Sequence, residues 1–256
     1  MKEQKILVLS DTHCGNVLGL TPPKWNPRDN KYQRLVRYRD NTWNWFRRQI
    51  DSIGKVDICV FNGDAIDGKG SRRGGLDQIW LDRTDQVQMA IDVLSIVNAK
   101  EFLFTFGTGY HTGIADDWEK EVAARFGGNI KDIQTVNLNG KTLKFRHYVG
   151  GSQSPISRGS ALYREQVWDI LWSLDGEFSM ADVCTFSHVH YFNQIRNRHS
   201  FMIQTPALQG LDGSPYGRRK LSGIVDFGFL LYRIDKNGRF SYEPYLLKQT
   251  PGVRGE

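Results

Sequence analysis

The chain has 256 residues, of which 39% are hydrophobic and 12% aromatic, so it can bury a substantial core and is not intrinsically disordered. No stretch approaches the roughly 18 consecutive apolar residues of a membrane helix, and the first residues become charged too early for a signal peptide. The formal net charge of +6 is compatible with an anionic substrate such as nucleic acid, without requiring one.

The first half of the chain alternates short apolar runs with longer amphipathic stretches. The runs predict buried strands, and apolar residues spaced three or four apart predict helices. In chain order, the predicted elements are strand 5–9, helix 32–50, strand 56–61, helix 85–97, strand 101–106 and helix 116–126. Strands that alternate with helices of this length indicate parallel β-α-β crossovers.

The second half of the chain carries more strand and turn signals. In chain order they are a hairpin at 135–149 with its turn at Asn139-Gly140, a helix at 160–174, strands at 181–186 and 225–234, and a hairpin turn at Asn237-Gly238. The sequence therefore predicts one mixed α/β domain over residues 1–256, richer in antiparallel strands towards its end.

The three cysteines, Cys14, Cys59 and Cys184, are odd in number and show no C-x-x-C spacing. Two of them lie in predicted apolar strands, which favours reduced thiols. The sequence therefore predicts a cytoplasmic protein without a membrane partner.

Aspartate and histidine side chains follow four of the predicted strands directly. Asp11 and His13 come after the first strand, Asp64 and Asp67 after the second, His111 after the third, and His188 and His190 after strand 181–186. His147 lies in the 135–149 hairpin, so these positions hold five of the six histidines of the chain. Because ligands of open α/β sheets bind at the carboxyl ends of strands, the pattern predicts a metal site there.

Each motif also has a structural explanation when it is taken alone. The acids could be turn residues, the hairpin histidine could be satisfied by hydrogen bonds, the third-strand histidine could be an ordinary loop residue, and the last pair could lie on the surface of an antiparallel strand. All of these explanations would have to hold independently. One metal site accounts for the shared placement, which is why we favour it.

The order and intervals of these motifs resemble the calcineurin-like metallophosphoesterase superfamily. From Asp11 to His190 the chain shows D-x-H, G-D-x-x-D, a turn of the G-N-H type, a lone histidine and H-x-H. The resemblance implies an α/β fold, a four-layer α-β-β-α sandwich with mixed sheets, and a two-metal site. It implies one ion held by Asp11, His13, Asp64 and His190, and a second ion, to which Asp64 bridges, held by His147 and His188.

The third motif departs from the family pattern. The family usually has Gly-Asn-His, with the asparagine amide oxygen on the second metal, whereas this chain has Gly107-Thr108-Gly109-Tyr110-His111. We expect His111 to keep the role of the family's histidine beside the leaving group, although it could instead replace the missing ligand. A weaker, water-completed or differently coordinated second site is therefore expected. Some phage-borne members of the family are similar in this turn.

The ligand types fit a phosphoesterase. Carboxylate and imidazole ligands without thiolate suit Mn²⁺, which we expect, and also Fe or Zn²⁺. We expect a metal-bridging hydroxide to attack phosphorus in line, with Asp64 as the bridging ligand and His111 as the proton donor to the leaving oxygen. Asp67 is expected to orient a ligand or to close its loop.

Basic residues near the motifs bear on the substrate, an anionic phosphoester. The glycine-rich loop at 68–75 does not match the Asp-Arg-Gly of the family's protein phosphatases, and a solvated loop is the alternative to a phosphate-binding one. The candidate substrate-binding residues are Lys69, Arg72, Arg73 and Arg158.

A long β-α connection at about 16–48 interleaves aromatic and basic residues. Its tryptophans and Tyr32 could stack on bases while its lysines and arginines follow a phosphate backbone. Trp43 and Phe46 also suit a helix that packs on the sheet.

We therefore expect a divalent-metal-dependent phosphodiesterase that acts on nucleic acid or a nucleotide. The alternatives are a phosphomonoesterase for phosphoprotein or a small metabolite, and a non-catalytic binding module on a degenerate phosphoesterase fold. A hydrolase of the metallo-β-lactamase type would need H-x-H-x-D-H, which the sequence lacks. No motif indicates an oligomeric state.

Overall fold

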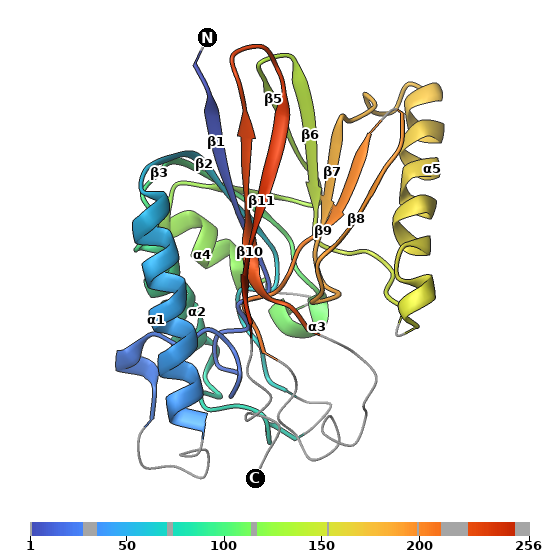
Figure 1. Ribbon diagram of the computed structural model, residues 1–256. Coiled ribbons are helices and arrows are strands. Elements are labelled where there is room, and N and C mark those ends of the chain that lie inside the picture. Colours follow the sequence, from blue (N-terminus) through green and yellow to red (C-terminus); the bar gives the residue numbers. More distant parts are fainter. Residues whose placement is uncertain are drawn as a thin grey trace.

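A computed structural model describes residues 2–27, 35–70, 74–113, 117–152, 154–198, 200–210 and 225–248. Its first sheet has six strands in the order β11-β10-β1-β2-β3-β4 (Figure 1). The strands are β1 (Gln4–Leu9), β2 (Val56–Asn62), β3 (Ala99–Thr105), β4 (Asn129–Lys131), β10 (Phe227–Ile234) and β11 (Phe240–Leu247). Strands β1 to β4 run parallel, whereas β10 and β11 are antiparallel to their neighbours. The parallel strands therefore end at one edge of the sheet.

The second sheet has five strands in the order β5-β6-β7-β9-β8. They are β5 (Gln134–Leu138), β6 (Lys141–Arg146), β7 (Val183–Phe186), β8 (Asn193–Arg196) and β9 (Phe201–Gln204). Strands β6, β7 and β9 are parallel, and β5 and β8 are antiparallel edge strands. Both sheets are therefore mixed, as expected, and the strands predicted in the sequence are confirmed. The short strands β4, β8 and β9 were not predicted.

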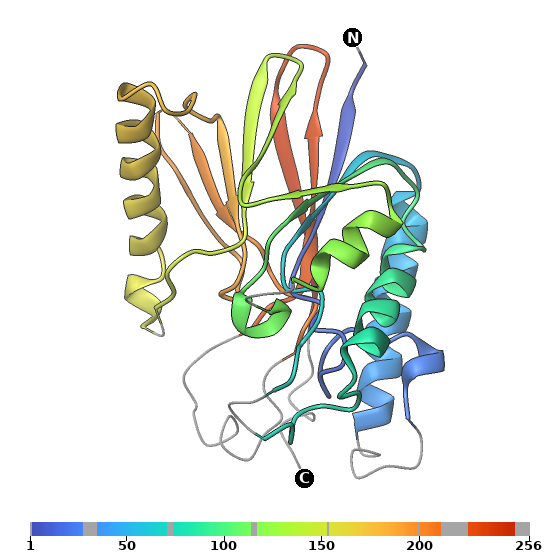
Figure 2. The same ribbon diagram turned by 180° about the vertical axis from the view of Figure 1, so that it is seen from behind.

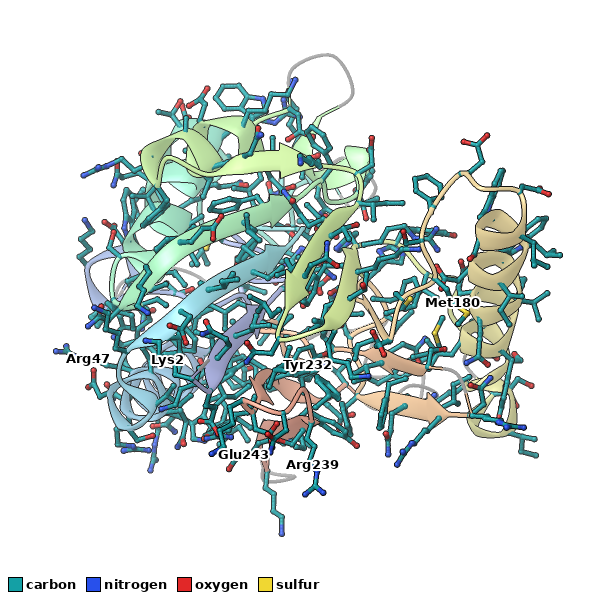
Figure 3. All side chains as sticks on the ribbon, turned by 90° about the horizontal axis from the view of Figure 1, so that it is seen from above. Lys2, Arg47, Met180, Tyr232, Arg239 and Glu243 are labelled. Carbon is teal, nitrogen blue, oxygen red and sulfur yellow. The ribbon has the colours of Figure 1, made fainter. Side chains whose placement is uncertain are left out.

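The two sheets pack face to face over an apolar core. Alternation along β1 points Ile6 and Val8 towards the second sheet, where they meet side chains such as Phe145 and Ile203. Tyr232 of β10 lies between the sheets (Figure 3), and its hydroxyl is 3.0 Å from Thr185 Oγ1. The buried hydroxyls satisfy one another, so the pair can lie inside this core.

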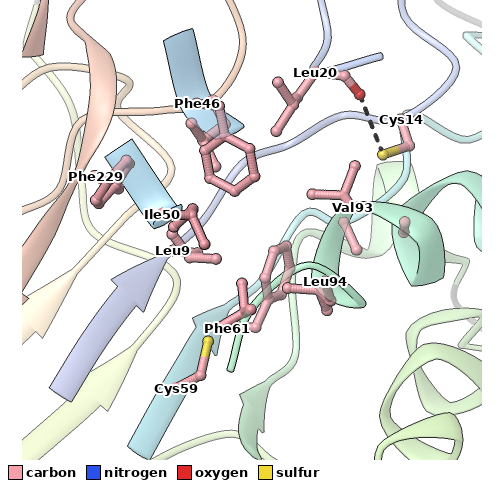
Figure 4. Close-up of a cluster of buried hydrophobic side chains, with 14 of the residues drawn as sticks. Leu9, Cys14, Leu20, Phe46, Ile50, Cys59, Phe61, Val93, Leu94 and Phe229 are labelled. Carbon is pink, nitrogen blue, oxygen red and sulfur yellow. Dashed lines mark hydrogen bonds between the residues drawn. The ribbon is translucent and has the colours of Figure 1, made fainter. Parts of the chain in front are cut away.

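Helices cover both outer faces. On the first sheet lie α1 (Val36–Ile53), α2 (Arg83–Leu94) and α4 (Glu119–Arg125), and on the second lies α5 (Ser160–Leu174), as Figures 1 and 2 show. Leu9 points away from the other sheet and meets Phe46 and Ile50 of α1 (Figure 4). The four layers are thus helix, sheet, sheet and helix, which confirms the predicted α-β-β-α sandwich.

The helices depart from the sequence predictions mainly at their ends. The helix expected at 32–50 spans Val36–Ile53, and α5 agrees with its predicted range of 160–174. Short helical turns are η1 (Pro23–Trp25), α3 (Gly109–Thr112) and η4 (Pro155–Ser157). Trp168 and Trp172 of α5 remain about half exposed, at 49% and 46%. No helix within the described ranges is both long and apolar enough to cross a membrane.

The structure places part of the aromatic and basic segment at 16–48 in the core. Trp43 and Trp45 are buried under α1, and the Trp45 ring centroid lies 5.7 Å from that of Phe227. Arg39 is fully buried, and its Nε donates to Asn26 Oδ1 at 2.6 Å. These side chains belong to the packing of α1 on the sheet, so they are not available to a nucleic acid. Tyr32 and its basic neighbours at 28–34 lie outside the described residues.

Candidate metal centre

The loops after β1 and β2 run side by side beyond the ends of their strands. The backbone N–H of Asp11 donates to Gly63 O at 2.9 Å, and the N–H of His13 donates to Asp64 O at 3.1 Å. A further bond joins Cys14 N to Ala65 O at 2.9 Å. The parallel pairing of β1 and β2 thus continues into the loops and places the first two motifs together.

Asp11, His13 and His190 form one group of possible metal ligands. His190 Nε2 lies 3.2 Å from Asp11 Oδ1 and 3.3 Å from His13 Nε2. The Asp11 Oδ1 atom is buried and has no hydrogen-bond partner among the described residues. A buried carboxylate oxygen without a partner is costly unless a cation satisfies it, so the group fits a bound metal.

Asp64, His147 and His188 form a second group. His147 Nδ1 lies 2.7 Å from the carbonyl oxygen of Asn62, which can only accept, so Nδ1 carries a proton. His147 Nε2 then offers its lone pair, 3.0 Å from Asp64 Oδ2. The lone pair of His147 Nε2 and the Asp64 oxygen would repel each other at this distance unless a cation, either a metal ion or a proton, lies between them. Burial would lower the pKa of His147, but the Asp64 carboxylate raises it to about 10, so a proton fills that role when no metal does.

Asp64 belongs to both groups by position. Its Oδ2 atom lies 3.0 Å from His147 Nε2 of the second group and 4.0 Å from His13 Nε2 of the first. Burial would raise the pKa of Asp64, but the neighbouring His147 holds it well below its usual range. The carboxylate therefore remains charged between the two sets of imidazoles, where a bridging ligand would lie.

The backbone of these residues is strained. Six non-glycine residues in the described ranges have positive φ, and five of them are candidate ligands: Asp11 (52°), His13 (41°), Asp64 (55°), His188 (74°) and His190 (58°). The sixth, Asn139, sits in the predicted hairpin turn. Such conformations cost energy and cluster at functional sites, where the surrounding structure enforces them. The strain sets these five side chains apart from ordinary turn residues.

Gly107 allows the third motif to approach Asp64. A Cβ atom at this position would lie 2.4 Å from both the backbone nitrogen and Oδ1 of Asp64. The absence of a side chain lets the next residue, Thr108, donate its backbone N–H to Asp64 Oδ1 at 2.6 Å. The loop after β3 thus fixes one oxygen of the carboxylate and leaves the other facing the histidines.

Asp67 contacts the ring of the candidate ligand His13. It is buried, and its Oδ1 atom is 3.2 Å from His13 Nδ1, so the ring donates from Nδ1 and turns Nε2 towards His190. Asn16 Nδ2 donates to the other carboxylate oxygen at 3.2 Å. Burial would raise the pKa of Asp67, but His13 lowers it, so the carboxylate stays ionised.

His111 lies beside the first group rather than the second. Its ring makes an edge contact with His13 at 4.6 Å between centroids, and its Nδ1 donates to the backbone carbonyl of Asp67 at 2.9 Å. The other ring nitrogen is therefore free to face a substrate. Burial and the neighbouring His13 lower the pKa of His111.

Glu119, the first residue of α4, was missed by the sequence interpretation because an acidic residue in the first turn of a helix is common. The structure buries its carboxylate, which accepts hydrogen bonds from Ala65 N at 2.5 Å and Gly107 N at 2.7 Å. It therefore holds the loop after β2 against the loop after β3. Burial and the nearby Asp64 charge raise the pKa of Glu119 to about 8. No sequence motif marks such a residue, because its partners are backbone groups.

Glu119→Gln should destabilise the protein by about 1–3 kcal/mol, because the new amide NH₂ must face one of the two backbone N–H groups and leave it unpaired. Urea unfolding with chelator present measures the loss. In the unfolded chain the pKa of Glu119 is near 4.5, and below that pH the difference in free energy of unfolding between wild type and variant should be greatest. The difference should shrink as pH rises towards about 8, where Glu119 ionises in the folded protein. Glu121→Gln, an exposed change on the same helix, is the control. Equal stability of the two variants would show that the hydrogen bonds from Ala65 and Gly107 to Glu119 do not stabilise the protein.

The candidate substrate-binding residues divide into those near the site and those that cannot be placed. Lys69 is exposed two residues beyond Asp67. Arg158 stacks over Tyr191, the residue after His190, at 4.3 Å from guanidinium carbon to ring centroid, and its buried Nε has no hydrogen-bond partner among the described residues. Arg72 and Arg73 lie outside the described residues.

No protein-family model matches the chain, and no curated protein matches its sequence. The solved structures that it resembles are distant in sequence. A single mutant of Vps29 from Entamoeba histolytica is 14% identical with a TM-score of 0.46, and the match covers 96% of this chain and 100% of that one. Vps29 from Cryptosporidium parvum is 10% identical with a TM-score of 0.49, covering 97% and 100%. A structure described as a novel archaeal phosphodiesterase is 14% identical with a TM-score of 0.41, covering 94% and 100%.

Proposed function

We propose that this chain is a divalent-metal-dependent phosphoesterase, and specifically a phosphodiesterase that acts on nucleic acid or a nucleotide in the cytoplasm. One observation carries the proposal: the ionised Asp64 carboxylate lies between two groups of buried and partly buried imidazoles, each able to hold an ion. Neither group contains a thiolate, and mixed carboxylate and imidazole ligands suit Mn²⁺, with Fe and Zn²⁺ as alternatives.

Asp11, His13 and His190 would hold one ion, and His147 and His188 the other, with Asp64 between them; bound metal would supply an activated water as the nucleophile and positive charge for the transferring phosphoryl group. The protein residues supply the remaining requirements. Asp67 fixes the tautomer of His13, and the Asn62 carbonyl fixes that of His147, so each ring presents the nitrogen that a ligand needs. His111, with Nδ1 held by the Asp67 carbonyl, can deliver a proton from its other nitrogen to the leaving oxygen.

A nucleotide fits the aromatic side chain beside the second ligand group. Tyr148 follows His147 directly, is 60% exposed, and its ring centroid lies 5.0 Å from that of His188. An exposed aromatic ring beside a phosphate-binding centre can stack on a base, which a small phosphate monoester would not use. Arg158, stacked over Tyr191, adds a positive charge beside the other group and favours a substrate with more than one phosphate.

The test is a comparison of substrates with Mn²⁺ present: bis-(p-nitrophenyl) phosphate, p-nitrophenyl phosphate, single-stranded DNA and double-stranded DNA. We expect turnover of the diester to exceed that of the monoester, and cleavage of at least one of the nucleic acids. A preference for the monoester would identify a phosphomonoesterase. No turnover of any substrate by protein that holds its metals would identify a binding module.

Tyr148→Ala should weaken binding of single-stranded DNA by roughly 5- to 150-fold, which corresponds to about 1–3 kcal/mol for one stacked base. KM or Kd for a short oligonucleotide measures the loss, and Tyr148→Phe should retain the wild-type value because the ring remains. Tyr163 of α5 is 57% exposed, so Tyr163→Ala is a matched control on another surface. An equal effect of the two alanine variants would exclude Tyr148 as a stacking site.

A further inference from the structure

The hydroxyl of Thr108 lies among the atoms of the second ligand group. Its Oγ1 atom is 3.1 Å from Asp64 Oδ2, 3.3 Å from His147 Nε2 and 3.1 Å from His188 Nδ1. The residues that supply these three atoms are the ones that form the group. One carboxylate oxygen, two ring nitrogens and one hydroxyl oxygen therefore converge on the same small volume.

The spacing of these four atoms matches the ligand shell of a cation. His147 holds its Nδ1 proton against Asn62 O, so a metal would take the lone pair of its Nε2 atom, which lies 3.0 Å from Asp64 Oδ2. A hydroxyl oxygen keeps two lone pairs while its one proton is donated elsewhere, so Thr108 Oγ1 can also face a cation. Four donor atoms spaced in this way suit four ligands around one ion.

The backbone holds Thr108 in this position. Its N–H donates to Asp64 Oδ1 at 2.6 Å, and its carbonyl accepts from His111 N at 2.8 Å at the start of α3. Gly107 packs against Asp64 on the other side. The hydroxyl is thus placed by the same contacts that place the bridging carboxylate, so it needs little ordering to act as a ligand.

We propose that Thr108 supplies a side-chain oxygen to the second metal ion, and so fills the coordination position for which the third motif has no asparagine. The proposal rests on the two-metal site of the proposed function, but not on hydrolysis. Threonine and serine hydroxyls serve as Mg²⁺ ligands in P-loop enzymes, and oxygen donors suit Mn²⁺ as well. His111, which contacts His13 and Asp67 instead, remains available to the substrate.

The test measures Mn²⁺ binding rather than activity. Chelator-treated protein is titrated with Mn²⁺ by calorimetry, and free Mn²⁺ is followed by electron paramagnetic resonance. We expect two ions to bind the wild type. Thr108→Ala should bind the first ion normally and the second about 10- to 100-fold more weakly, the range found for residues that support metal sites. Thr108→Ser keeps the hydroxyl and should bind both ions.

Two further variants control for packing. Thr108→Val keeps the shape of the side chain without the oxygen, so it should behave like Thr108→Ala. Thr185→Val removes a buried hydroxyl between the sheets, where it bonds to Tyr232, and should leave both affinities unchanged. Equal second-ion affinity in the wild type, Thr108→Ala and Thr108→Val would overturn the assignment. A wild type that binds fewer than two ions would refute the two-metal site itself, whereas two bound ions without hydrolysis would refute only the catalytic function.

Discussion

Asp64→Asn should abolish hydrolysis and lower the metal content of the protein, while the fold is retained. The variant removes the negative charge that both ligand groups share, and it turns an NH₂ group or a neutral oxygen towards the imidazoles. Loss of bound metal removes several kcal/mol of transition-state stabilisation, which lowers the rate by roughly a thousandfold or more. The fold should survive because asparagine can still accept the Thr108 N–H, and because it tolerates the positive φ of 55°.

Elemental analysis of purified protein and hydrolysis of bis-(p-nitrophenyl) phosphate together measure this effect. Asp57→Asn is the matched control, because Asp57 lies near the other end of the same strand and pairs with Lys100. The control should keep its metals and its activity. Unchanged metal content and activity in Asp64→Asn would show that the site is assigned wrongly.

His111→Ala should keep both metals and lose rate by roughly 10²- to 10⁴-fold, as expected for a proton-transfer group. The loss should be greatest for esters with poor leaving groups. A p-nitrophenolate leaving group needs little protonation, so its rate should fall least. His111 lies beside Asp67 and His13 and outside the second ligand group, so it does not fill the position of the missing asparagine. Because His13, Asp67 and His111 form a third group of possible ligands, the metal content of this variant is measured beside its rate.

The pH dependence of wild-type hydrolysis provides a second measurement of the same role. Burial and His13 hold the pKa of His111 below its ordinary value of 6.5, so the protonated form is lost as pH rises through that lowered pKa. The kcat/KM for an ester with a poor leaving group should therefore decline as pH rises through the pKa of His111. The His111→Ala variant should not show this decline. If the variant instead lost one metal and slowed all esters alike, His111 would be a ligand.

The fold could be predicted from the sequence wherever the hydrophobic pattern was strong. Strands β1 and β2 are mostly buried apolar runs, β3 ends in an apolar run, and α5 has clear amphipathic spacing, so each was predicted within about three residues. The edge strand β8, with the sequence Asn193–Arg196, is half exposed and polar, and forms because β9 lies beside it. The hydrophobic pattern of a segment does not show which strand will lie beside it in the sheet.

The grouping of the candidate ligands could be predicted where aspartate and histidine residues follow strands directly. The structure brings Asp11, His13, Asp64, His147, His188 and His190 into two adjoining groups at the carboxyl ends of the parallel strands. Thr108 and Glu119 could not be recognised in the same way. Their importance comes from distances across the fold, and a threonine in a loop or a glutamate in a helix is ordinary in sequence.

Composition does not show which residues of the segment at 16–48 are buried. Trp43 and Trp45 of α1 are buried, Trp45 against Phe227 of β10, and Arg39 is held by Asn26 and the Val17 carbonyl. The spacing of apolar residues could indicate that α1 is amphipathic. It could not indicate that Arg39 would be buried with the apolar face. Residues near the metal groups, such as Tyr148, are better candidates for contact with a substrate.

Anomalous X-ray diffraction from crystals grown with Mn²⁺ tests the central claim most directly, because it locates the ions without reference to activity. We expect two anomalous peaks about 3.5–4 Å apart, one beside Asp11, His13 and His190 and the other beside His147 and His188, with the Asp64 carboxylate between them. A single peak, or two peaks that do not share Asp64, would contradict the account.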